Sequence, residues 1–454
     1  MKDTLIYRLR SLMLPGLKRW IVVILFGIAS IVLGVFLLLG YHPLTVTGQF
    51  LREVMEHAAD VLPYRMSGII VITAGAIIIC VAIAKIILSV LGAYLPSDRE
   101  SIPDVLYRKR HLGRGPKIVA IGGGTGLSNL LKGIKNYTNN ITAIVTVGDD
   151  GGSSGRLRQE LGVLPPGDIR NCITALADEE KLVTELFRYR FESGEGLEGH
   201  SFGNLFLTAI WTITRGDMLE AVRVASRVLN SCGMVLPSTL TPVQLCAEME
   251  DGRMVQGESQ ISKAGGKIKQ IRSEPVARAT PEALQAIASA DLIILGPGSL
   301  YTSIIPNLLV DGISEAILQA KARKLYVCNV MTQLGETIDY SVSDHLEALL
   351  LHARVAQPTA NKLIQAAVIN DQLPEHKTEP ATTPVAFDSD RVRALGIAPL
   401  RKPLVNEAIG SHHDPERLAK EIMMWFFTKK SQRHLSEQKK TTDLYQRVAS
   451  FFSI

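Results

Sequence analysis

The chain has 454 residues, of which 46% are hydrophobic, and a formal net charge of +5 at pH 7. Its length suggests two or three structural units. Residues 1–117 carry 14 Lys and Arg against 7 Asp and Glu, a balance of +7, so residues 118–454 balance at −2. That balance argues against a basic nucleic-acid-binding domain, which must neutralise a run of phosphates. The five cysteines form no CxxC pair, which argues against a zinc or disulfide framework.

Two apolar stretches near the N-terminus predict a membrane anchor over residues 1–95. Residues 20–40 contain no charged side chain, and a helix of that length spans about 31 Å, close to the thickness of a bilayer core. Residues 66–85 form a second apolar stretch, which ends at a lysine. The alternatives are a signal peptide for the first and a buried helix for the second. Because a signal core has only about 7–15 apolar residues, we expect two transmembrane helices.

Basic residues predict the orientation of this anchor. Five Lys or Arg precede the first stretch and seven lie from Lys85 to Lys117, whereas only Arg52 and Arg65 lie between the two stretches. The positive-inside rule therefore places both ends of the anchor in the cytoplasm. We expect a multi-pass protein of the inner cell membrane whose soluble domain is cytoplasmic.

Alternating strand and helix patterns predict the fold of the remainder. Residues 96–116 read as a polar linker, 117–428 as one nucleotide-binding domain, and 429–454 as a polar tail. Buried strands are expected at 117–121 and 141–147, with a glycine loop and a helix between them, and this theme returns at 290–309 and 324–330. Asp251–Gly252 predicts an inserted β-hairpin. We expect an α/β, Rossmann-like, mainly parallel sheet with helices on both faces.

Glycine-rich loops follow two of the predicted strands. The first contains Gly123, Gly124, Thr125 and Gly126; the second contains Gly296, Gly298, Ser299, Tyr301 and Thr302. Glycines at the start of a helix let free backbone N–H groups approach a phosphate, although such a loop can also be a plain tight turn. Leu127 occupies the third glycine position of the dinucleotide fingerprint, and no Walker A sequence follows.

An acidic pair, Asp149 and Asp150, follows the second predicted strand and precedes Gly152, Ser153 and Ser154. Three interpretations stay open. A divalent cation, in practice Mg²⁺, bridges the carboxylates and a phosphate. Alternatively, the carboxylates accept sugar hydroxyls while the glycine–serine turn binds the phosphates. As a third possibility, one aspartate caps the following helix.

Two further polar motifs supply candidate ligand contacts. "LPPGDIRN" presents Asp168 and Asn171 from a proline-braced turn, where Asp168 as a helix cap is the simpler interpretation. "EGHSFGN" presents His200 and Asn204 beside glycines. No second His or Cys at metal spacing accompanies His200, so no zinc site is expected. The segment "MTQLGET" at 331–337 follows another strand and is expected to complete the rim of the pocket.

Taken in order, these motifs resemble a known family. "GGGTGLS", "DDGGSSGRLR", "PPGDIRN", "EGHSFGN", "LPSTL" and "GPGSLYTSIIPNLLV" are similar to the gluconeogenesis factor (YvcK-like) proteins of the 2-phospho-L-lactate transferase (CofD-like) superfamily. The resemblance implies a Rossmann-like fold. It also implies that Asp149 and Asp150 correspond to the family's acidic pair and the glycine loops to its phosphate-binding segments. One departure is the membrane hairpin, since family members are typically soluble.

The resemblance implies two functions from different classes. In the gluconeogenesis factor branch the protein is a regulator that binds UDP-sugars, notably UDP-N-acetylglucosamine, and supports cell-wall synthesis and cell shape. In the transferase branch an enzyme moves a phospholactyl group from a guanosine diphosphate carrier to a deazaflavin with Mg²⁺, and Asp149 and Asp150 are then the catalytic candidates. We expect the first, with cell-wall synthesis proteins and a second copy of the chain as partners and no nucleic acid.

Overall fold

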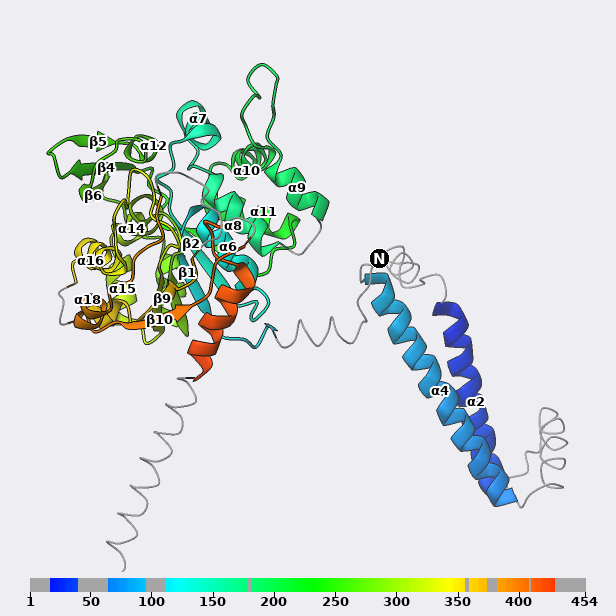
Figure 1. Cartoon of the computed structure of the whole chain (residues 1–454). Coiled ribbons are helices and arrows are strands. Elements are labelled where there is room, and N and C mark those ends of the chain that lie inside the picture. Colours follow the sequence, from blue (N-terminus) through cyan, green and yellow to red (C-terminus); the bar gives the residue numbers. More distant parts are fainter. Residues whose placement is uncertain are drawn as a thin grey trace, which may run out of the picture. The chain divides into compact units, whose positions relative to one another are not determined.

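A computed structural model describes residues 17–39, 64–94, 112–177, 181–355, 359–373, 382–407 and 410–428. The chain divides into two compact units, residues 1–108 and 109–454, and Figure 1 shows both. Most of the predicted linker and the whole predicted tail lie outside the described residues.

The first unit is a pair of long apolar helices, α2 (Leu17–Leu39) and α4 (Tyr64–Tyr94). Within them, 21 residues of α2 and 22 of α4 are long and apolar enough to cross a membrane. Glycines face the partner helix at two levels: a Cβ at Gly34 would lie 2.9 Å from the Gly68 carbonyl oxygen, and one at Gly27 would lie 3.1 Å from that of Gly75. These contacts make the helices antiparallel and bring their backbones close together, as small residues do between membrane helices.

The second unit is built on a seven-stranded sheet in which every strand pair is parallel. In sheet order its strands are β10 (Ala398–Lys402), β9 (Ala366–Asn370), β8 (Arg323–Val327), β7 (Leu292–Leu295), β1 (Ile118–Gly122), β2 (Ile141–Val145) and β3 (Met234–Pro237). Ile118 and Ala120 enter one hydrophobic core, and Val119 and Ile121 enter the other. Both faces of the sheet are therefore buried, which explains the continuous apolar runs.

Helices cover each face of this sheet (Figure 1). One core is closed by α6 (Gly124–Ile134), α8 (Gly167–Leu176), α10 (Phe202–Ile213), α11 (Met218–Val228) and a helix at 415–428. The other is closed by α13 (Pro281–Ser289), α14 (Ile305–Leu308), α15 (Ile313–Gln319), α16 (Val342–His352), α17 (Ala360–Leu363) and α18 (Ser389–Ala394). The predicted α/β class, with helices on both faces of a mainly parallel sheet, is confirmed.

The predicted hairpin insertion is also present, within a small second sheet. β4 (Gln244–Met249) pairs with β5 (Met254–Gln256) across the Asp251–Gly252 turn, and β6 (Ile268–Glu274) adds a third antiparallel strand. The His352 Nε2 atom of α16 accepts a hydrogen bond of 3.0 Å from the Ile271 N–H of β6. The short helix α12 (Glu258–Ile261) follows β5.

The strand order creates a topological switch point between β1 and β7. The chain runs from β1 to β2 and β3 on one side, and from β7 to β8, β9 and β10 on the other. β1 and β7 are themselves hydrogen-bonded neighbours, so the loops at their carboxyl ends lie side by side. In open α/β sheets this is the usual place for a ligand.

Candidate functional site

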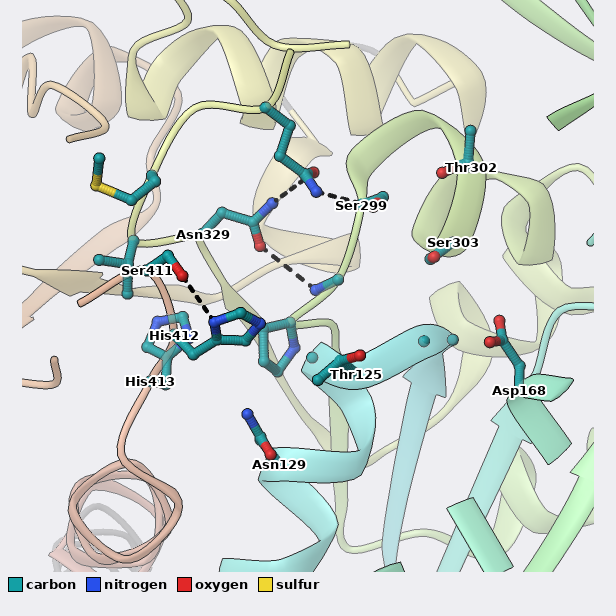
Figure 2. A pocket seen from close by; sticks show the side chains of 18 of the residues that line it. Thr125, Asn129, Asp168, Ser299, Thr302, Ser303, Asn329, Ser411, His412 and His413 are labelled. Atoms are coloured by element: carbon teal, nitrogen blue, oxygen red, sulfur yellow. Dashed lines mark hydrogen bonds between the residues drawn. The ribbon is translucent and has the colours of Figure 1, made fainter. Parts of the chain in front are cut away.

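A cavity of about 830 Å³ lies at this switch point, lined by both glycine loops. Its volume falls in the range of about 300–1,000 Å³ that is typical of ligand pockets. Figure 2 shows its labelled polar side chains, which come from well-separated parts of the chain. Nine of the predicted site residues line it: Gly123, Gly124, Thr125, Gly126, Asp149, Asp168, Gly298, Ser299 and Thr302.

Close approach of the two glycine loops requires glycine. A Cβ at Gly126 would lie 2.7 Å from the Pro297 carbonyl oxygen, which is too close for any side chain. Gly124 has φ +64 and begins α6, whose preceding residue supplies no side-chain cap. The Gly124 N–H is bound by the Asp168 carboxyl, and Thr125 and Gly126 carry the rest of the first turn of α6 along the cavity lining, where a helix N-terminus would stabilise an anionic group.

Three acidic side chains also line the cavity: Asp168, which packs against the Gly123–Gly124 turn, and Asp149 and Glu258. Burial, reinforced by the charge of Asp149, raises the pKa of Asp168 to about 7, although the Gly124 N–H hydrogen bond favours its ionised form. Burial and the charge of Asp149 likewise raise the pKa of Glu258 to about 8. Acidic groups with such perturbed pKa values cluster at functional sites.

The two adjacent aspartates point in different directions. Asp149 lines the cavity, and its Oδ1 atom accepts a 2.9 Å hydrogen bond from the Gly151 N–H. Asp150 lies outside the lining; its Oδ1 atom accepts a 2.9 Å hydrogen bond from the Ser259 N–H in the first turn of α12. Asp150 thus binds the first turn of α12, and of the pair Asp149 alone lies in the cavity lining.

Ser153, Ser154, His200 and Asn204 form a separate buried cluster, outside the cavity lining. It joins the N-terminus of α7 (Gly152–Leu161) to that of α10. Ser153 Oγ lies 3.0 Å from His200 Nδ1, and the Asn204 Nδ2 amide donates to Ser153 Oγ at 3.1 Å. Burial lowers the pKa of His200, which favours its neutral imidazole.

The remaining predicted residues also lie outside the lining. Asn171 Oδ1 accepts a 2.7 Å hydrogen bond from Arg170. The Tyr301 hydroxyl lies 2.9 Å from that of Tyr340, in the second core. Gly296, with φ +75, directly follows β7, and Gly152, with φ +47, begins α7.

Sequence reasoning missed several lining residues. Those without any prediction are Asn129, Thr146, Glu258, Pro297, Ser303, Asn329, Val330, Thr382, Ser411, His412 and His413. The consecutive histidines were a usable signal, since two titratable rings stand in a polar segment just before the last helix. Burial, with the neighbouring His412, lowers the pKa of His413 to about 4. The expected rim segment does contribute, through Met331, Thr332, Gln333 and Leu334.

The fit of Mg²⁺ depends on the cavity carboxylates. No group of three or more His, Cys, Asp or Glu within the described ranges is arranged to hold a metal ion by itself. Mg²⁺ is commonly bound through one or two carboxylates with water and substrate phosphates. Asp149, next to Asp168, can supply such ligands, so the predicted Mg²⁺ site stays a prediction in which Asp150 has no part at the cavity.

Comparisons with known proteins identify the family. A family model described as "2-phospho-L-lactate transferase CofD" matches residues 118–405. A "Putative gluconeogenesis factor" of Nostoc sp. is 48% identical over 91% of this chain and 91% of its own length, and the "Gluconeogenesis factor" of Bacillus subtilis is 49% identical over 68% and 97%. A crystal structure from Bacillus halodurans, 45% identical, covers 68% of this chain and 100% of its own, with a TM-score of 0.65. The chain belongs to the CofD family, among the gluconeogenesis factors.

Proposed function

We propose that this chain is a membrane-tethered regulatory protein that binds a nucleotide sugar of the UDP-N-acetylglucosamine type and supports cell-wall synthesis and cell shape. The observation that carries the proposal is the cavity at the β1–β7 switch point, which is lined by the first turn of α6, by the second glycine loop and by three carboxyl groups. One end of this cavity suits a diphosphate. The other suits the hydroxyl groups of a sugar, or a cation that bridges to the phosphates.

The carboxyl groups support a sugar in particular. Burial raises the pKa of Asp168 to about 7 and that of Glu258 to about 8, so near neutral pH these groups carry a proton for part of the time. A protonated carboxyl both donates and accepts hydrogen bonds, as a sugar hydroxyl does. A second phosphate at this end would instead meet the charge of Asp149.

The first unit supports the tether. Its two helices have the length and composition of membrane spans, and the chain's basic residues flank the spans on the side predicted to be cytoplasmic. A tethered domain would meet its ligand and partners at the inner membrane face, where cell-wall precursors are assembled. Cell-wall synthesis proteins and a second copy of the chain are the proposed partners.

A second function is favoured by the name of the matching family model. In this alternative the chain transfers a phospholactyl group from a guanosine diphosphate carrier to a deazaflavin, with Mg²⁺ held near Asp149 and Asp168. The acidic end of the cavity would then receive the acceptor hydroxyl instead of a sugar.

A thermal-shift panel on the full chain in detergent separates the two functions. The ligands are UDP-N-acetylglucosamine, UDP, GDP, NAD and a deazaflavin, each with and without Mg²⁺. At 100 times its dissociation constant a ligand stabilises the folded state by about 2.7 kcal/mol. We expect a shift with the UDP-sugar; a shift with GDP and the deazaflavin, and none with the UDP-sugar, would replace the proposal with the alternative.

A further inference from the structure

A chain of directed hydrogen bonds reaches the cavity from the rim segment that follows β8. The Gly298 backbone N–H donates to Asn329 Oδ1 at 3.4 Å, Asn329 Nδ2 donates to Gln333 Oε1 at 3.1 Å, and Gln333 Nε2 donates to Ser299 Oγ at 2.9 Å. Figure 2 shows these contacts as dashed lines around Asn329 and Ser299. Asn329, Gln333 and Ser299 all line the cavity.

The Gly298 N–H fixes the direction of every hydrogen bond in this series. A backbone N–H can only donate, so the atom of Asn329 that faces Gly298 is its oxygen, and its amide nitrogen then faces Gln333. Gln333 must in turn present its oxygen to Asn329 and its nitrogen to Ser299. The backbone of Gln333 is itself held, because its N–H donates to Thr337 Oγ1 at 2.9 Å and its carbonyl accepts from the Thr337 N–H at 2.9 Å.

This direction determines what the Ser299 hydroxyl can still do, because Gln333 donates to it. A serine hydroxyl has one proton and two lone pairs, and Gln333 occupies a lone pair. Within the described part of the protein, the Ser299 hydroxyl donates no hydrogen bond, so its proton is available to the cavity. Thr302, three residues on, shows the opposite arrangement, because its hydroxyl donates to the buried Glu336 carboxylate at 2.7 Å.

We propose that Asn329 and Gln333 are positioning residues that turn the Ser299 hydroxyl into a donor toward a phosphoryl oxygen of the ligand. The proposal rests on the proposed function and deepens it, because it fixes where the ligand's diphosphate lies along the cavity. The Ser299 hydroxyl then donates to an acceptor atom of the ligand. The Thr302 hydroxyl already donates to Glu336, so it can only accept a hydrogen bond from a ligand hydroxyl or N–H. The direction of these hydrogen bonds does not depend on pH, because the side chains of Asn329, Gln333 and Ser299 do not titrate.

A double-mutant cycle on the full chain in detergent tests this inference by calorimetry. Ser299→Ala removes the donor to a charged oxygen, and we expect UDP-N-acetylglucosamine and UDP to bind about 10- to 100-fold more weakly. Gln333→Glu presents an acceptor that captures the Ser299 proton. In that background Ser299→Ala should cost almost nothing further, because the donor is already lost, and the cycle subtracts the direct effect of the new charge.

Asn329→Asp gives an independent route to the same state. Aspartate still accepts from the Gly298 N–H but cannot donate to Gln333, so the Gln333 amide turns over and its oxygen captures the Ser299 proton. We expect the loss of affinity to match that of Ser299→Ala within about threefold. Gln319→Glu, on the exposed end of α15, adds the same charge far from these hydrogen bonds and should leave the affinity for the ligand unchanged.

The outcomes are distinguishable. Additive effects of Ser299→Ala and Gln333→Glu would show that Gln333 does not act through Ser299 and would overturn this inference while leaving the proposed function in place. A loss on Ser299→Ala that is equally large for uridine would show that the acceptor is not a phosphoryl oxygen. If the wild-type protein bound neither UDP nor the UDP-sugar, that result would contradict both the proposed function and this inference.

Discussion

At the scale of single residues, the cavity is defined by which carboxyl groups face it. Asp149 and Asp168 do, while Asp150 is held by the first turn of α12. A Cβ at Gly123 would lie 2.5 Å from Asp168 Oδ2, so the glycine loop and this carboxyl are packed against each other. Burial outweighs the favourable charge of Arg170 at this carboxyl, so keeping it ionised carries a free-energy cost in the folded protein.

Replacing Asp168 with asparagine should therefore stabilise the ligand-free protein at alkaline pH. The unfolded chain ionises this carboxyl from about pH 4, whereas the folded state does so only at about pH 7. Stability is thus lost as pH rises from 4 to 7, and the full cost is present above about pH 7. We expect Asp168→Asn to raise the free energy of unfolding by roughly 2–4 kcal/mol at pH 8, with the gain vanishing toward pH 4, measured by urea unfolding.

Asp251→Asn is the matched control for this measurement. Asp251 lies in the exposed β4–β5 turn, where the Arg253 N–H lowers the pKa of its carboxyl, so no gain at pH 8 is expected. If Asp168→Asn destabilised the protein equally at pH 5 and pH 8, the hydrogen bond to Gly124 would outweigh the cost of burying the charge.

The sequence predicted the cavity residues that directly follow strands. It did not predict which of two neighbouring side chains points into the cavity. Gly123–Gly126, Asp149 and Ser299 come just after strands and so reach the sheet edge. Asp150 is also an aspartate and directly follows Asp149, but it binds the Ser259 N–H of α12 and does not line the cavity. Likewise, His200 and Ser153 are paired by the meeting of two helix N-termini, which no local pattern reveals.

At the scale of elements, the contact between the β1 and β7 loops holds the site together. The sequence predicted both loops but not that their strands are neighbours, because strand order depends on long-range packing. Gly126 stands where the loops meet, 2.7 Å from the Pro297 oxygen when a Cβ is added. The spacing of the loops therefore depends on this one missing side chain.

Gly126→Ala should separate the two loops and weaken ligand binding by more than tenfold. The added methyl group cannot fit beside the Pro297 carbonyl, which is backbone and cannot rotate away. Calorimetric titration of UDP-N-acetylglucosamine into the full chain measures the loss. Gly151→Ala is the matched control, since Gly151 has φ −90 and a Cβ there would meet its nearest neighbour at an ordinary 3.5 Å; equal losses in both variants would contradict the account.

In the helix pair, Gly27→Leu should force α2 and α4 apart. A Cβ at Gly27 already lies 2.6 Å from Ile79 Cγ1, and a leucine would add three further carbons to that contact. Because Gly27 stands opposite Gly75 and Gly34 opposite Gly68, the antiparallel register puts the exposed Val22 and Cys80 at the same level. Oxidative cross-linking of Val22→Cys to Cys80 in membranes therefore reports how close the two helices are. We expect Gly27→Leu to abolish the cross-link and Val32→Leu, at a half-exposed position, to preserve it. A cross-link of equal yield in both would show that the glycines do not set the spacing.

At the scale of the whole molecule, the relatives differ in how much of this chain they match. The Bacillus subtilis relative is covered over 97% of its length by 68% of this chain, whereas the Nostoc match covers 91%, more than residues 109–454 alone could supply. The match to the Nostoc relative therefore extends into the first unit. The Bacillus subtilis relative, already covered over 97% of its length by 68% of this chain, has almost no residues left to match the first unit.

Removing residues 1–108 should release the second unit from the membrane. The two helices are the described segments long and apolar enough to span a bilayer, so the full chain should sediment with membranes and the truncated chain should not. In inverted vesicles, protease should cleave the second unit of the full chain, and in intact spheroplasts it should not. Sedimentation of the truncated chain, or cleavage in spheroplasts, would contradict the proposed tether or its orientation.

The most direct test of the central claim is a crystal or cryo-electron microscopy structure of the chain with UDP-N-acetylglucosamine. The account predicts the diphosphate between the first turn of α6 and Ser299, with the sugar toward Asp168 and Glu258. Density for the ligand at the Ser153–His200–Asn204 cluster, or anywhere outside the β1–β7 switch point, would contradict it.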